Sequence, residues 1–180
     1  MAHKLFIIVQ FVPLSVFLAI VRWTDGSGPD WKLAFIISGC IAAVESILLF
    51  TTKKIVNRFI WAVNLFLVVG AVSFALKIHP ILSLYKNLMQ SALFASLVLI
   101  GLVTTFFSVN GFIGAKHSNK HIVRSYSIYL LIASLFAFIL SMLFRGNMLL
   151  AGILPFIGLL LINKLLRLKL NTLDKNTRTI

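Results

Sequence analysis

Residues 88–107 read LMQSALFASLVLIGLVTTFF, twenty consecutive residues without a charged side chain. A helix of this length measures about 30 Å, which matches the hydrocarbon core of a bilayer. Five other stretches are comparably apolar: Leu5–Val21, Leu33–Phe50, Ile55–Leu76, Tyr126–Phe144 and Met148–Leu166. The sequence therefore predicts an all-α, polytopic membrane protein, a bundle of about six transmembrane helices in which Leu88–Phe107 is the fourth.

The composition agrees with insertion into a membrane. Of the 180 residues, 60% are hydrophobic and 12% are charged, and the mean hydropathy is +1.03. A soluble domain of this size cannot bury so much apolar surface, so the lipid bilayer is an expected partner. The formal charge of +13 would suggest nucleic acid in a soluble protein. Here the cations stand at the ends of apolar stretches, so we expect them to meet anionic lipid headgroups at the cytoplasmic face, and we expect no nucleic acid.

The Lys and Arg residues divide unevenly between the two sides of the predicted membrane. Twelve of the 17 fall on the side that holds both termini. The five on the other side are Arg22, Lys32, Lys77, Lys86 and Arg145. Because Lys and Arg concentrate in cytoplasmic segments, the sequence predicts that both termini lie in the cytoplasm.

We predict a single transmembrane domain over residues 1–170, followed by a loose cytoplasmic tail over residues 171–180. The first stretch is predicted to be a retained span rather than a cleaved signal peptide, because no small-residue cleavage pattern follows Val21. Glycines and a proline predict a sharp turn in residues 24–30.

Prolines mark three further points in the chain. A short interfacial helix is expected to begin after Pro80, where apolar and polar residues mix in residues 77–87. Pro13 and Pro155 stand within the first and sixth predicted spans, where proline can kink a helix.

Glu45 is the only acidic residue within a predicted span. An ionisable group in a bilayer is costly unless it faces the bundle or water, so Glu45 is a candidate for function. Arg58 lies at a similar depth in the next span, and the favoured interpretation is a salt bridge that pins this hairpin. Two alternatives stay open: Glu45 handles a proton or a cation, or it is a neutral, hydrogen-bonded carboxylic acid.

Four amide side chains, those of Gln10, Asn64, Gln90 and Asn110, are assigned to the spans. Such amides form hydrogen bonds between helices, each worth about 1 kcal/mol or less, and this structural role is favoured. Convergence of Gln10 and Asn110 with Glu45 would form a polar pocket open to the cytoplasm. The candidate intramembrane polar site consists of Glu45, Arg58, Gln10, Asn64 and Asn110.

The sequence gives little indication of catalysis. It contains no Ser/His/Asp set, no Gly-rich phosphate loop and no paired carboxylates, so neither an enzyme nor a cofactor is expected. His117 and His121 are four residues apart, but the lysines beside them repel a cation, so we expect no metal. The lone Cys40 is interpreted as a small hydrophobic residue. Small residues at 38–43 and at Gly70-Ala71 permit close helix approach.

Three segments of the first four spans resemble the intracellular septation protein A family, small bacterial inner-membrane proteins. They are QFVPLSVFLA at 10–19, LVVGAVSF at 67–74 and LYKNLMQSALFASLVLIG at 84–101. The resemblance covers about residues 5–101, and its family-like positions are Pro13, Gly70, Lys86, Phe94 and Gly101. The chain departs from the family pattern at Tyr85, where the family has tryptophan, and at Asn87-Leu88, where it has Pro-Thr.

The resemblance implies a bacterial inner-membrane protein that supports cell-envelope maintenance or septation without enzymatic activity. Its expected partners are membrane proteins of envelope synthesis, and a homo-oligomer is left open. The alternative from the residues themselves is a small transporter or channel that uses the Glu45-centred polar site. A weaker third option is a subunit of an enzyme or flippase for lipid-linked substrates, with cytoplasmic cations binding phosphate headgroups.

Overall fold

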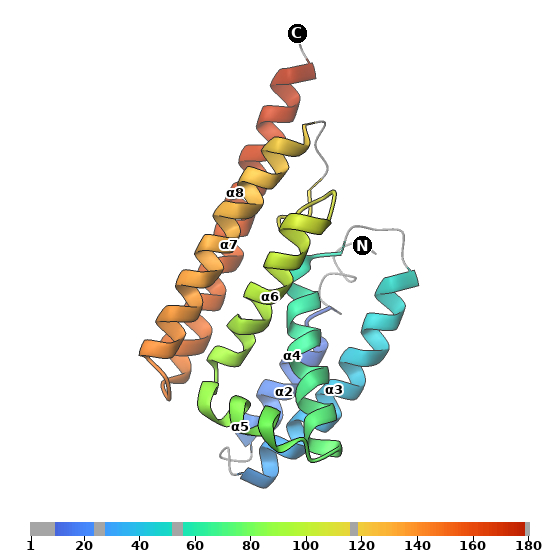
Figure 1. The fold of residues 1–180 in the computed structure, drawn as a ribbon, viewed down its shortest axis with the longest axis vertical. Helices are drawn as coiled ribbons and strands as arrows, with labels where there is room; N and C mark the ends of the chain where they lie inside the picture. Colours follow the sequence, from blue (N-terminus) through green and yellow to red (C-terminus); the bar gives the residue numbers. More distant parts are fainter. Residues whose placement is uncertain (1–9, 24–27, 52–55, 116–118, 179–180) are drawn as a thin grey trace. The chain divides into compact units, whose positions relative to one another are not determined.

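The computed structural model describes residues 10–23, 28–51, 56–115 and 119–178. These residues form seven α-helices and one π-helical turn, and no β-strand occurs among them, which confirms the all-α prediction. In chain order (Figure 1) the elements are α2 (Val12–Trp23), α3 (Gly28–Thr51), α4 (Arg58–Ala75), α5 (His79–Leu88), α6 (Ser91–Phe107), α7 (Lys120–Leu143), the π-helical turn η1 (Leu149–Ile153) and α8 (Leu154–Arg178).

Four segments within the described helices are long and apolar enough to cross a membrane: Trp31–Thr51, Arg58–Ala75, Lys120–Leu143 and Leu149–Leu173. The bent pair α5 and α6 would raise this number to five if it is counted as one span. Helix α2 has only 12 residues, and the part of the first predicted span before residue 10 lies outside the described residues. The chain is thus compatible with a multi-pass membrane protein, while the number six stays a prediction.

The chain divides into two compact units. Unit 1 comprises Met1–Lys54 and Ile60–Asn87, and unit 2 comprises Ile55–Phe59 and Leu88–Ile180. The single domain over residues 1–170 stays a prediction.

In unit 1, glycines allow helices α3 and α4 to pack closely. A Cβ atom added at Gly39 would overlap the side chain of Ala71, and one added at Gly70 would overlap the ring of Phe35. Larger side chains at these two positions would therefore push the helices apart. The prediction that small residues permit close approach here is confirmed.

An aromatic cluster fills the interior of unit 1 and joins its helices. Phe35 lies at its centre, fully buried, with ring centroids of neighbouring side chains 4.8 to 6.1 Å away. Those neighbours are Phe17 from α2, Trp31 from α3, Phe66 and Phe74 from α4 and Tyr85 from α5. The Tyr85 hydroxyl also donates a hydrogen bond of 2.7 Å to the carbonyl oxygen of Phe66, which ties α5 to α4. A helix does form in residues 77–87, as predicted, and it begins at His79.

In unit 2, α7 presents a seam of small buried side chains at heptad spacing. Ser127, Ser134 and Ser141 are seven residues apart and fully buried. The Ser141 hydroxyl shares a 3.0 Å hydrogen bond with that of Ser91 in α6. The Ser127 and Ser134 hydroxyls donate to backbone carbonyls one turn earlier, so each is satisfied within its helix. A seven-residue repeat keeps one face of a helix toward a neighbour, and serines let the two backbones approach.

Several helix limits differ from the sequence prediction for local reasons. Helix α7 begins at Lys120 rather than Tyr126, because the Asn119 side chain caps it by accepting a 2.9 Å hydrogen bond from the His121 N–H. Helix α8 continues to Arg178, through most of the segment for which a loose tail is predicted, and the tail itself stays a prediction. No glycine or proline interrupts the sequence after Gly158, so nothing ends the helix earlier.

The two span prolines lie where the backbone tolerates them. Pro13 is the second residue of α2, in the first turn, where a missing N–H costs no hydrogen bond. Pro155 is the second residue of α8 and follows η1, where the α-helical hydrogen-bond pattern is already interrupted.

Candidate functional site

Glu45 lies on the buried face of α3, where it meets Asn64 of α4. The Asn64 amide nitrogen donates to Glu45 Oε2 at 3.2 Å and to the Ser46 hydroxyl oxygen at 3.1 Å. Ser46 in turn donates a 2.7 Å hydrogen bond to the Ala42 carbonyl oxygen. All three polar side chains therefore belong to one network between two spans of unit 1. This network has the form of the interhelical amide bond expected from the sequence.

The same network retains unused hydrogen-bonding capacity. Glu45 Oε1 and Asn64 Oδ1 are buried, and neither has a hydrogen-bond partner among the described residues. The Ser38 hydroxyl, seven residues before Glu45 on α3, is in the same condition. A seven-residue separation puts Ser38 and Glu45 on one face of the helix. Unpaired oxygens of this kind can accept a proton or coordinate a small cation, which keeps the alternatives for Glu45 open.

The five residues of the predicted polar site divide between the two units. Gln10, Glu45 and Asn64 belong to unit 1, whereas Arg58 and Asn110 belong to unit 2. Gln10 is buried, and its amide nitrogen has no hydrogen-bond partner among the described residues. Arg58 donates from Nη2 to the hydroxyl oxygen of Ser108 at 3.0 Å. The salt bridge from Arg58 to Glu45 stays a prediction.

The four amides assigned to spans differ in their local structure. Only Asn64 lies inside a helix: Gln10 is in the turn before α2, Gln90 is the residue before α6, and Asn110 is in the turn after α6. Helix α6 ends at Phe107 because Ser108 adopts an extended backbone and Gly111 a left-handed one, at φ +58°. Hydrophobicity alone did not place these turns.

Sequence reasoning missed a compact loop over residues 108–115, which joins α6 to α7. Its residues Gly111 to Gly114 are buried, and Gly111 and Gly114 both have positive φ. The Phe112 ring stacks on that of Phe59, with centroids 5.8 Å apart. The Ile113 N–H donates to the Ser127 hydroxyl oxygen at 3.3 Å. The pattern Gly-Phe-Ile-Gly at 111–114 was the available signal for a tight, apolar turn.

Arg167 of α8 donates hydrogen bonds to the backbone of this loop. Its Nε donates to the Ile113 carbonyl oxygen at 2.8 Å, and its Nη2 donates to the Gly114 carbonyl oxygen at 3.1 Å. The guanidinium group thus satisfies two backbone acceptors that the loop cannot pair internally. Arg58 and Arg167 both donate hydrogen bonds to the 108–115 loop.

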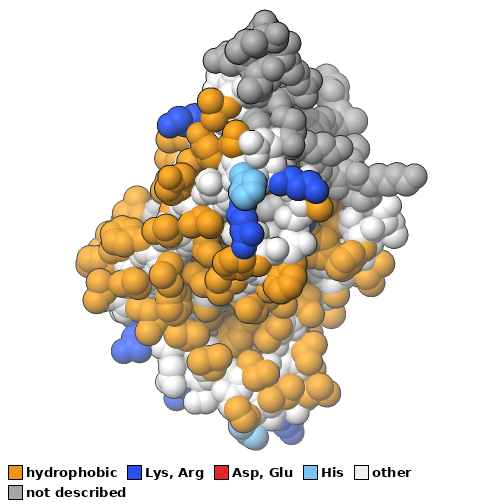
Figure 2. Space-filling view, turned by 45° about the horizontal axis from the view of Figure 1, so that its top comes forward, with side chains coloured by type: hydrophobic (Ala, Val, Ile, Leu, Met, Phe, Trp, Pro, Cys, Tyr) orange, Lys and Arg blue, Asp and Glu red, His pale blue; other side chains and the backbone are white. Residues whose placement is uncertain are grey.

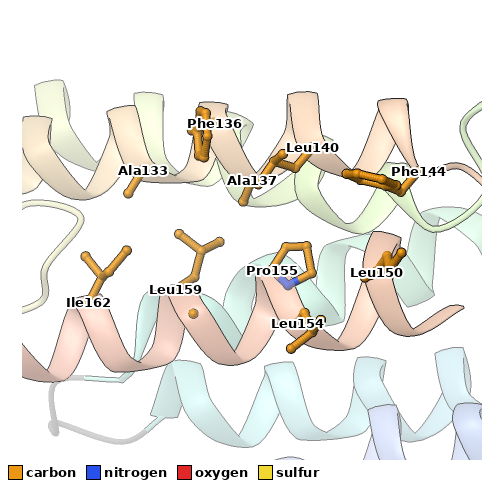
Figure 3. A pocket seen from close by; sticks show the side chains of 11 residues that line it. Ala133, Phe136, Ala137, Leu140, Phe144, Leu150, Leu154, Pro155, Leu159 and Ile162 are labelled. Atoms are coloured by element: carbon orange, nitrogen blue, oxygen red, sulfur yellow. The ribbon is translucent and has the colours of Figure 1, made fainter. Parts of the chain in front are cut away.

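An apolar hollow of about 350 Å³ lies between α7 and the segment formed by η1 and α8 (Figure 3). Phe136 and Leu140 of α7 face Pro155 and Leu159 of α8 across it. The complete lining is Ala133, Phe136, Ala137, Leu140, Phe144, Leu150, Leu154, Pro155, Gly158, Leu159 and Ile162. A site of this composition suits a hydrocarbon chain or an apolar side chain and offers no group for acid–base chemistry.

The histidines and the cysteine form no metal site within the described part of the chain. No group of three or more His, Cys, Asp or Glu side chains gathers there. His121 is exposed in the first turn of α7, and His117 lies outside the described residues. Cys40 is exposed on α3.

The five residues at family-like positions lie in different surroundings in the structure and differ in packing and exposure. Gly70 allows the contact with Phe35, and Gly101 lies against the side chains of Phe112 and Leu131. Pro13 and Phe94 are buried, and Lys86 is exposed in the last turn of α5.

Comparisons with protein-family models, with curated proteins and with solved structures give no match.

Proposed function

We propose that this chain is a non-enzymatic, multi-pass protein of the bacterial inner membrane, with both termini in the cytoplasm, that supports envelope maintenance or septation. It acts through contacts between its helices and membrane proteins of envelope synthesis. The observation that carries this proposal is the hollow between α7 and α8, which gives the apolar outer surface of this hairpin a shape for a partner helix. Between Ile128 and Ile162, most of the exposed large side chains of these two helices are hydrophobic.

The hairpin offers a surface for another helix. Phe136 and Tyr129 of α7 and Leu161 and Leu165 of α8 are more than half exposed. Hydrophobic side chains are widespread among the described residues on the face seen in Figure 2. In a bilayer, apolar surface by itself does not drive association, so partner helices bind through shape and close packing. The hollow between α7 and α8 supplies shape, because a side chain of a partner helix can enter it.

The experiment is site-specific photo-crosslinking in growing cells. A photoreactive residue replaces Phe136 or Leu161 on the outer surface, and Leu130, which is fully buried in α7, is the matched control position. We expect crosslinks from the two outer positions to defined proteins of wall synthesis or division, and none from residue 130. Crosslinks to lipid alone from both outer positions would contradict the proposal.

A second candidate function, a small transporter or channel, is favoured by the unpaired oxygens of Glu45 and Asn64. In that case Glu45→Gln removes the ionisable group while keeping a similar shape, and it abolishes flux in proteoliposomes. If the carboxylate is structural, the same variant changes only thermal stability or assembly. Wild-type proteoliposomes without proton or cation flux would exclude this candidate.

A further inference from the structure

Two arginines of unit 2 converge on the 108–115 loop from different helices. Arg58 is the first residue of α4, and Arg167 lies within the second half of α8. Both side chains are half-buried, and both donate to acceptors of this loop. Donor and acceptor of each contact are 50 to 54 residues apart in sequence, so the fold itself brings both guanidinium groups to this loop.

These two charges lack a counter-ion among the described side chains of unit 2. Their acceptors are a serine hydroxyl and two backbone carbonyls, which carry partial charges only. Unit 2 contains one acidic residue in its sequence, Asp174, whose side chain is outside the described part. Asp174 follows Arg167 by seven helical residues, which separates the two residues by about 10 Å along the helix axis. Half-buried like charges without a carboxylate are unfavourable, and an anion would relieve them.

The arrangement also has a free donor. Arg58 Nε is buried and has no hydrogen-bond partner among the described residues, although the guanidinium already binds Ser108 through Nη2. Adjacent N–H groups of one guanidinium form a planar fork that suits two oxygens of a phosphate. Exposed cations nearby in sequence, Lys120 and Arg124 at the start of α7 and Lys164 of α8, belong to the predicted cytoplasmic set.

We propose that Arg58, Arg167 and the 108–115 loop form a binding site for a phosphate group at the cytoplasmic surface of the membrane. The phosphate belongs either to a lipid headgroup or to a free phosphate ion, since both present the same oxygens. The site goes beyond the proposed envelope function and does not depend on it. A salt bridge from Arg58 to Glu45 is the competing account of Arg58, but it would leave Arg167 without a counter-charge.

The test uses the full chain in nanodiscs, with retained lipid counted by native mass spectrometry. The probes are phosphatidic acid and phosphatidylglycerol diluted in phosphatidylcholine, and separately inorganic phosphate added to pure phosphatidylcholine nanodiscs. Retention of an anionic lipid alone assigns the site to a headgroup. Binding of inorganic phosphate in pure phosphatidylcholine assigns it to a free ion. Either result supports the site, and binding of neither probe overturns it.

Variants separate this site from general surface charge. Arg58→Gln and Arg167→Gln are expected to weaken binding by about tenfold or more, because each loses a charge-assisted contact. Lys169→Gln, an exposed residue two positions from Arg167, is the matched control and should bind as the wild type does. Equal loss in all three variants would overturn the proposal.

Two further comparisons keep the test decisive. If the Gln variants do not fold, Arg58→Lys and Arg167→Lys retain the charge but lose the planar fork, and binding is expected to fall several-fold. Unchanged binding in both Lys variants would then contradict the geometry. Glu45→Gln is expected to leave phosphate binding unchanged. Clearly tighter phosphate binding in this variant would show that the Glu45 carboxylate forms a salt bridge with Arg58 and competes with phosphate.

Discussion

The backbone of Gly70 in α4 lies directly against the ring of Phe35 in α3, and a methyl group at residue 70 has no room. Phe35 is also the centre of the aromatic cluster, with five aromatic neighbours. In unit 1, Gly70 therefore permits the close contact between α3 and α4, and Phe35 joins the aromatic side chains of four helices. The contact sets how closely α3 and α4 pack, and with it the distance between Glu45 and Asn64.

Replacing Gly70 with alanine should destabilise the protein by about 1–3 kcal/mol, the usual cost of overpacking a filled interior. The measurement is thermal unfolding in detergent, followed by circular dichroism. Gly158→Ala is the matched control, because it is also a helical glycine and no atom lies within 4 Å of the added Cβ. Equal melting temperatures for the two variants would contradict the close contact.

The serine seam of α7 predicts a second size-dependent effect. Ser134→Leu places a large side chain at a fully buried position and should cost about 1–3 kcal/mol or prevent folding. Ser125→Leu adds the same side chain at an exposed position of the same helix and should leave stability nearly unchanged. Comparable yields and melting temperatures for both would show that the seam is not packed.

Glu45 and Asn64 should be energetically coupled, because Asn64 donates to Glu45 across the α3–α4 interface. A double-mutant cycle with Glu45→Leu and Asn64→Leu is expected to give a coupling of about 0.6 kcal/mol, the average for hydrogen bonds between membrane helices. Reversible unfolding in mixed micelles provides the free energies. Strictly additive effects would argue against the hydrogen bond.

The uneven distribution of Lys and Arg predicts a topology that cysteine labelling can check. In a Cys40→Ala background, single cysteines at Asn119 and Asn171 should be protected from a membrane-impermeant maleimide in intact cells. Single cysteines at Ser83 and Gly146 should react, because the sequence places them outside the cytoplasm. The opposite labelling pattern would invert the orientation, and mixed labelling at all four positions would indicate a different number of spans.

Local patterns predicted the helices well and the connections poorly. Long apolar stretches account for α3, α4, α7 and α8, because a span needs about twenty such residues. The segment 108–115 was assigned no structure, although Gly111 and Gly114 mark a turn. Its form depends on Arg58 and Arg167, which are distant in sequence, and no local pattern shows which acceptors they reach. Likewise, helix α8 continues to Arg178, through residues for which a loose tail was predicted.

Of the candidate polar site, the pair Glu45 and Asn64 is described by the structure, and the convergence of the other members with it stays a prediction. Glu45 and Asn64 stand out as polar residues in apolar surroundings, and the structure brings them together. No local pattern shows whether Gln10 and Asn110 lie beside them, because that depends on which helix faces which. The heptad repeat of Ser127, Ser134 and Ser141 was readable from the sequence, and a search for seven-residue periodicity would have found it.

The most direct test of the envelope function is fluorescence imaging of the tagged protein in dividing cells, together with a deletion strain under osmotic and wall stress. We predict enrichment at division sites and an envelope defect in the deletion strain. An even signal around the membrane, together with an intact envelope under both stresses, would contradict the proposed function.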